Sequence, residues 1–92
     1  MKTVRLHITG KVQGVWYRAS AKDKAISLNL KGKVWNNPDG SVGAVVQGPE
    51  DIVDDFINWC RQGPMLAHVT DVRVSEEATD DVLTSFEIVR NL

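Results

Sequence analysis

The sequence predicts an α+β fold in which an antiparallel sheet carries two helices on one face. Three observations support this. Apolar and polar residues alternate in several short segments, apolar residues recur at helical spacing in two others, and the segments follow the order β-α-β-β-α-β with a short strand appended at the C-terminal end. Alternation indicates a half-buried strand, because neighbouring side chains point to opposite faces. This order is that of the ferredoxin-like sandwich.

The first half of the chain supplies a strand, a helix and a hairpin. Apolar residues at every second position predict a strand over residues 4–9. Apolar residues spaced by three or four positions predict a helix over roughly residues 18–28. Residues 31–36 and 41–47 are predicted strands, and Asn37-Pro38-Asp39-Gly40 between them is a strong turn signal. The two strands therefore form a hairpin.

The second half supplies a helix and two strands. Gly48-Pro49-Glu50-Asp51 predicts a helix start, with Pro49 in the first helical position and the acids at the positive end of the helix dipole. A wide apolar stripe follows, and Gln62-Gly63-Pro64 ends the helix. Residues 67–75 form a valine-rich strand whose valines break strict alternation, which allows a bulge. We expect an exposed acidic loop over residues 76–81 and a short terminal strand over residues 86–90.

Length and composition narrow the functional classes. The 92 residues suit one domain, spanning 1–92. The net charge of −1 gives no reason to expect nucleic acid or an acidic membrane as a partner. No apolar run approaches the roughly 20 residues that span a bilayer. Cys60 is the only cysteine, so an intramolecular disulfide is impossible and a cytoplasmic location is expected. The two histidines and Cys60 lack metal-ligand spacing.

The segment from Gly10 to Arg18 holds the most informative pattern. Gly10 and Gly14 flank a loop that joins the first strand to the first helix, and Arg18 follows in the first helical turn. Glycines let several backbone N–H groups converge on one point, the helix adds its positive end, and a guanidinium fits a phosphate. The alternative is an ordinary strand-to-helix turn with a solvated arginine, and spacing alone does not choose between the two.

Three motifs carry a resemblance to a known family. They are Gly10-Lys11-Val12-Gln13-Gly14-Val15-Trp16-Tyr17-Arg18, Gly32-Lys33-Val34-Trp35-Asn36-Asn37-Pro38-Asp39-Gly40-Ser41-Val42, and Gly63-Pro64-Met65-Leu66-Ala67-His68-Val69. Their composition and separation resemble the signatures of the acylphosphatases, small enzymes that hydrolyse the carboxyl–phosphate bond of acyl phosphates. With the matching element order, the resemblance covers nearly the whole chain.

The resemblance implies a site and a reaction. It assigns phosphate binding to Arg18 and the placing of the attacking water to Asn36. It also assigns a cradle of backbone N–H groups to the loop: Val12, Gln13, Gly14, Val15, Trp16, Tyr17 and Arg18. No metal and no organic cofactor are needed. The expected partners are an acyl phosphate substrate and inorganic phosphate as product and inhibitor, and the expected state is a monomer.

Several positions depart from the family pattern. Tyr17 replaces the usual phenylalanine, so its hydroxyl needs a partner. Lys33 and Trp35 flank Asn36 and should share one face of the strand while Asn36 occupies the other. Gly43 replaces a frequent acidic residue, which we interpret as a surface change. Trp16 suits either the pocket mouth or packing, and the sequence leaves this open.

Three other functions compete with the enzyme. An RNA-recognition module would stack bases on aromatic residues of the two central strands, residues 4–9 and 41–47, which contain none. A non-catalytic anion-binding module would keep the cradle without turnover, and the presence of both Arg18 and Asn36 argues against it. Carbamoyl-phosphate handling within a larger maturation protein would need zinc-binding cysteines, which are missing here.

Overall fold

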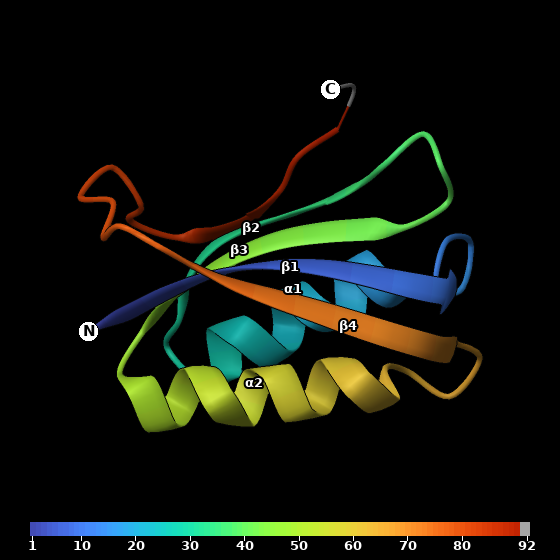
Figure 1. The fold of residues 1–92 in the computed structure, drawn as a ribbon, viewed down its shortest axis with the longest axis horizontal. Helices are drawn as coiled ribbons and strands as arrows, with labels where there is room; N and C mark the ends of the chain where they lie inside the picture. Colours follow the sequence, from blue (N-terminus) through green and yellow to red (C-terminus); the bar gives the residue numbers. More distant parts are fainter. Residues whose placement is uncertain (91–92) are drawn as a thin grey trace.

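The computed structural model describes residues 1–90, and Figure 1 shows their arrangement. The elements in chain order are β1 (Lys2–Lys11), α1 (Tyr17–Ser27), β2 (Lys31–Asn36), β3 (Val42–Gly48), α2 (Glu50–Gln62), β4 (His68–Glu77) and β5 (Phe86–Ile88). Both helices cover the same face of one sheet (Figure 1). The predicted ferredoxin-like sandwich is therefore confirmed. Within residues 1–90, no helix is long and apolar enough to cross a bilayer.

The sheet has the strand order β4-β1-β3-β2-β5. β1 pairs with β3 and β4, and β3 pairs with β2, in each case antiparallel as predicted. The appended strand β5 pairs with β2 in parallel, which makes the sheet mixed at that edge. The reason is topological. β4 ends at the end of the sheet where β1 and β2 begin, so a chain that continues beside β2 from there runs in the same direction.

Most predicted boundaries agree with the structure to within two residues, and one cap differs. Pro49 precedes α2 instead of starting it, because its ψ of 141° is extended. Its carbonyl accepts the first helical hydrogen bond, from the N–H of Val53 at 2.9 Å. The predicted bulge is present: Thr9 pairs with Asp71 while Gly10 pairs with Val69, which leaves one extra residue on β4. Two other ends differ: β4 continues to Glu77 and β5 ends at Ile88.

The core lies between the sheet and the two helices. Its largest fully buried side chains come from the sheet, from the β1–α1 loop, from α2 and from the start of α1: Tyr17, Phe56, Leu6, Ile8, Val4, Val12, Val34, Val42, Val46, Val53 and Cys60. Each buried aliphatic or aromatic side chain contributes about 1.5–3 kcal/mol. Helix α1 also contributes Ala21 and Ala25 to the core, and their small side chains let the helix lie close to the sheet.

On the face of the sheet that the helices do not cover, Gly43 proves not to be the surface change that we expected. Gly43 is buried, and it pairs with Trp35 across β2 and β3. A Cβ atom at Gly43 would lie 2.5 Å from the indole ring, so the ring occupies the space of a side chain. The guanidinium of Arg5 lies 5.5 Å from the centroid of the same ring. Glycine at position 43 is therefore a packing requirement of Trp35.

Candidate active site

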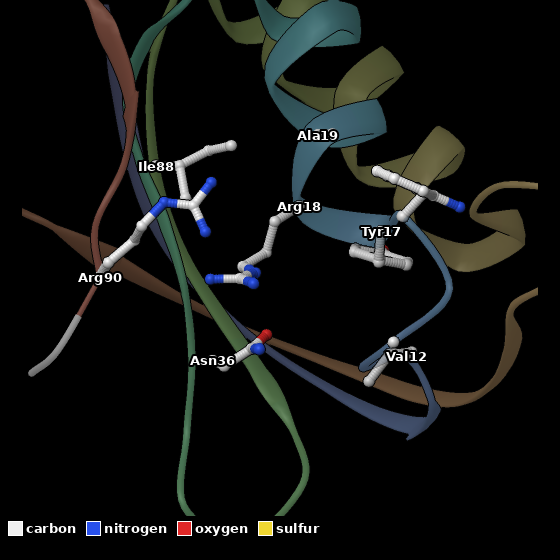
Figure 2. A pocket seen from close by; sticks show the side chains of 9 residues that line it. Val12, Tyr17, Arg18, Ala19, Asn36, Ile88 and Arg90 are labelled. Carbon is white, nitrogen blue, oxygen red and sulfur yellow. The ribbon is translucent and has the colours of Figure 1, made fainter.

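The predicted loop arginine and the predicted asparagine line the same pocket (Figure 2). The pocket has a volume of about 320 Å³ and lies where the β1–α1 loop, the end of β2 and the segment after β5 meet. It is lined by Val12, Gly14, Trp16, Tyr17, Arg18, Ala19, Asn36, Ile88 and Arg90. This volume is at the small end of the usual range for ligand sites, and it suits a phosphate with a short attached group.

The β1–α1 loop reaches the pocket through two left-handed residues. Gly14 has φ 74° and Trp16 has φ 67°. A left-handed conformation is easy for glycine but costs a residue with a side chain about 1–2 kcal/mol. Burial of the indole does not offset this cost, because Trp16 is 75% exposed. Backbone strain of this kind is concentrated at functional sites, and here it lies on the pocket wall.

The N-terminus of α1 is also unfavourable for the helix taken alone. Among residues 1–90 no side chain caps it, its first turn holds no acidic residue, and Arg18 places a positive charge there. By contrast, α2 begins with Glu50 and Asp51, as the helix dipole favours. Unpaired N–H groups, the positive dipole end and a guanidinium would all be stabilised by an anion in the pocket. The local sequence of α1 therefore matches an anion-binding helix start.

Asn36 is the last residue of β2, and its side chain carries an unsatisfied acceptor. Its Oδ1 atom is buried and has no hydrogen-bond partner among the described residues. An acceptor left in this state costs about 1–3 kcal/mol. Figure 2 shows the side chains of Asn36 and Arg18 pointing toward one another across the pocket. A molecule that enters between them would lie beside this amide, which carries both a hydrogen-bond donor and an acceptor.

Gln13 joins the loop to the β2–β3 turn. Its Nε2 donates to the carbonyl oxygens of Asn37 and Ser41, at 2.8 and 2.9 Å. The side chain therefore points away from the pocket lining and fixes the distance between the loop and the end of β2. This contact couples the position of the loop to that of Asn36, although the two are separated by more than twenty residues.

The turn itself is fixed by side chains. Asn37 accepts from Trp35 Nε1 through Oδ1 and donates to Ser41 Oγ through Nδ2, both at 2.9 Å. The Asp39 carboxylate accepts from the backbone N–H of Ser41 at 2.9 Å and from its hydroxyl at 2.5 Å. The two bonds from Ser41 hold the pKa of Asp39 below its ordinary value. Asn37 is therefore more than a turn residue, since it links the turn to the sheet.

The start of α1 is anchored by Tyr17. The hydroxyl of Tyr17 finds its required partner in the carbonyl oxygen of Cys60, to which it donates at 2.7 Å. Burial raises the pKa of the Tyr17 hydroxyl far above its ordinary value, and it raises the pKa of the Cys60 thiol to about 12. The Cys60 thiol is therefore buried and protonated. This bond ties α1 to α2 one residue before Arg18.

The loop residues separate into two groups. Five of the seven predicted cradle residues line the pocket, together with Asn36: Val12, Gly14, Trp16, Tyr17 and Arg18. The other two have different contacts, because Gln13 bonds to the turn and Val15 is buried in the core. Trp16 lies at the pocket and is exposed, which answers the question that the sequence left open.

Sequence reasoning missed three lining residues: Ala19, Ile88 and Arg90. Ala19 carries no polar signal. Ile88 and Arg90 share the alternation of the terminal segment, which places both on one face. The alternation could not show that the face shared by Ile88 and Arg90 lies against the pocket, because its placement depends on the pairing of β5 with β2. Among residues 1–90, no three histidine, cysteine or acidic side chains gather to form a metal site.

Together these features define a class of protein: a ferredoxin-like α+β domain with a loop and helix start arranged for a phosphate-sized anion. Comparisons with known proteins narrow this class. A family model described as Acylphosphatase matches residues 4–88. An acylphosphatase of Methylococcus capsulatus is 48% identical over 92 residues, all of both chains, and one of Thiobacillus denitrificans is 48% identical over 95% of this chain and 96% of its own.

A solved structure supports the same conclusion. The crystal structure of the Bacillus subtilis acylphosphatase has a TM-score of 0.93 and 32% identity, covering 97% of this chain and 99% of that one. The chain therefore belongs to the acylphosphatase family, and the resemblance stated from the three motifs is confirmed.

Proposed function

We propose that this acylphosphatase cleaves its substrate by in-line attack of water, with Arg18 and the N–H groups at the start of α1 binding the phosphate. In this mechanism Asn36 positions the water. The observation that carries the proposal is that Asn36, whose Oδ1 has no hydrogen-bond partner among residues 1–90, lines the same pocket as Arg18. A guanidinium binds phosphate oxygens, and an amide can orient a water molecule through both its donor and its acceptor.

The chemistry of an acyl phosphate suits this set of residues. An acyl phosphate is a mixed anhydride, and its leaving group is a carboxylate that is stable without an added proton. Phosphoryl transfer passes through a loose transition state with charge on the peripheral oxygens. Of residues 1–90, nine line the pocket, and none of the nine carries a carboxylate, an imidazole or a thiol. Charge stabilisation and water placement are therefore what this lining supplies, without a general acid or a protein nucleophile.

The energetic contribution of these groups is large enough. Removing one preorganised donor from a charge-stabilising site costs about 2.7–4 kcal/mol of transition-state stabilisation. Positioning of the reacting water lowers the barrier by several kcal/mol more. The uncapped start of α1 is important here, because its N–H groups are already oriented and need little rearrangement during the reaction.

The non-catalytic anion-binding alternative accounts for only part of the site. It explains Arg18 and the start of α1 but gives no role to Asn36. A binding module would gain stability by replacing a buried, unsatisfied amide with an apolar residue. Because this amide costs the protein stability, its presence supports a catalytic role over anion binding alone.

We also propose that the protein is a cytoplasmic monomer that inorganic phosphate inhibits competitively. The buried, reduced Cys60 is compatible with a reducing compartment.

The test is hydrolysis of benzoyl phosphate, followed by absorbance in the presence of EDTA. We expect wild-type activity to be unaffected by the chelator and to be lost in Arg18→Ala. Binding of inorganic phosphate, measured by isothermal titration calorimetry, should be lost in the same variant. Lys24→Ala is the matched control, because it removes a positive charge from α1 outside the pocket lining. Unchanged phosphate binding in Arg18→Ala would contradict the role of Arg18. Gel filtration tests the monomer.

A further inference from the structure

A second arginine faces the pocket opposite the first. Arg90 lies two residues beyond β5, and the proposed mechanism uses only Arg18. In Figure 2 the guanidinium of Arg90 extends from the C-terminal segment toward α1, into the same space that Arg18 enters from the helix. The pocket therefore has a cation on each of two walls, and one of them has no assigned role.

The direction of Arg90 follows from backbone pairing. The N–H of Val89 donates to the carbonyl oxygen of Val34 at 2.9 Å, so the segment stays attached to β2 past the end of β5. Alternation then puts Ile88 and Arg90 on the helix-covered face and Val89 on the other. The pockets agree with this: Ile88 and Arg90 line the proposed active site, and Val89 lines a hollow on the opposite face with Arg5 and Trp35.

The two guanidinium groups are not neutralised by the pocket itself. The lining that residues 1–90 provide contains no aspartate or glutamate. In the described part of the chain, neither Arg18 nor Arg90 lies within salt-bridge distance of a carboxylate, whereas Arg5 pairs with Glu77 at 2.6 Å and Arg73 with Asp71 at 3.6 Å. Two positive charges beside one small pocket favour a ligand with more than one anionic group.

We propose that Arg90 is a specificity residue that binds a second anionic group on the acyl half of the substrate. The inference rests on the proposed function, in which Arg18 and the start of α1 hold the phosphate that is transferred. The acyl group then extends toward Ile88 and Arg90. The preferred substrates are acyl phosphates of small acids that carry a further carboxylate or phosphate group, and the guanidinium binds either through paired N–H donors.

The experiment compares matched substrates on wild-type and variant proteins. The probes are benzoyl phosphate rings substituted at position 3 with a carboxylate, a phosphonate or an uncharged carboxamide. The measured quantity is the ratio of kcat/KM for each charged probe to that for the carboxamide. We expect Arg90→Gln to lower this ratio about five- to tenfold, the size of a partly exposed charge-assisted contact. Arg90→Lys should restore part of it, and added salt should reduce the wild-type ratio.

Lys11→Gln is the control, because Lys11 is exposed beside the loop but does not line the pocket. It should leave the ratio unchanged. If Arg90→Gln lowers the ratio for the carboxylate probe alone, the recognised group is a carboxylate. If it lowers the ratio for the phosphonate probe alone, the recognised group is a phosphate. An equal ratio in wild type and Arg90→Gln, or an equal fall in Lys11→Gln, overturns the proposal. These outcomes are separate from the proposed function, which depends on benzoyl phosphate hydrolysis and on Arg18→Ala.

Discussion

Two adjacent asparagines allow activity and stability to be separated. Asn36 carries a buried oxygen with no partner among residues 1–90, whereas both polar atoms of the Asn37 side chain are hydrogen-bonded within the turn. Replacing each by alanine removes the same atoms from neighbouring positions. We expect opposite consequences, because the first amide faces the pocket and the second holds the turn together.

For Asn36→Ala the expected loss is catalytic. If the amide places the attacking water, kcat should fall about 100- to 1000-fold, as when a preorganised donor is removed from other active sites. Inhibition by inorganic phosphate should change little, because Arg18 and the start of α1 remain. Stability should not suffer. Relief of the unsatisfied acceptor is worth about 1–3 kcal/mol, and the lost packing of three atoms costs roughly 1 kcal/mol.

For Asn37→Ala the expected loss is structural. Two side-chain hydrogen bonds disappear, and the indole N–H of Trp35 and the hydroxyl of Ser41 each lose a partner. At about 0.5–1.5 kcal/mol for each bond, the free energy of unfolding should fall by about 1–3 kcal/mol. The Gln13 contact to the backbone carbonyl of Asn37 can persist. The reduction in kcat should therefore be much smaller than for Asn36→Ala.

The assay pairs urea denaturation with benzoyl phosphate kinetics on the two variants and wild type. The reasoning fails if Asn36→Ala loses more than about 1 kcal/mol of unfolding free energy, the size of one hydrogen bond, because the amide would then be structural. It also fails if Asn36→Ala weakens phosphate inhibition as strongly as it lowers kcat, since Asn36 would then be a binding residue.

Four further outcomes are expected. Tyr17→Phe should lower the free energy of unfolding by about 1–3 kcal/mol in urea titration, since the buried carbonyl of Cys60 loses its partner; unchanged stability would mean that the bond contributes nothing. The Cys60 thiol, with a pKa raised to about 12, should react with iodoacetamide at pH 8 far more slowly in native than in guanidinium-unfolded protein, and equal rates would contradict its burial. Gly43→Ala should cost about 1–3 kcal/mol by overpacking against the indole ring, and a stable variant would show that the ring can move. Because the pKa of Asp39 is lowered in the fold, its carboxylate stabilises the protein above its ordinary pKa near 3.8, and this stabilisation is lost as the pH falls through the lowered value. The Tm difference between wild type and Asp39→Asn should therefore be present at pH 7 and vanish in acid, and a difference independent of pH would refute the charge effect.

Patterns that act within one element were predictable from the sequence. Alternation in β1 and the apolar stripe of α2 predicted their buried faces, because strand and helix geometry alone decide which side chains share a side. The turn at residues 37–40 was predictable for the same reason, since proline and glycine restrict or permit backbone angles locally. The motif around Arg18 and the motif around Asn36 predicted the chemistry of the site through the family resemblance.

Relations between elements were not predictable in this way. The parallel pairing of β5 with β2 depends on where β4 ends, and it brings Arg90 to the pocket. Gly43 was misinterpreted as a surface substitution, because nothing in its own segment indicates that the Trp35 ring lies over it.

The sequence by itself determined the element order and the faces that become core. Through the family resemblance it also pointed to the residues that we propose bind and hydrolyse an acyl phosphate. The tertiary structure decided which of these residues meet. It turned Gln13 toward the turn, buried Val15, left Asn36 Oδ1 without a partner and set Arg90 opposite Arg18. The physical reason is that periodicity and turn chemistry are local, whereas pairing across the sheet and burial depend on residues far apart in the chain.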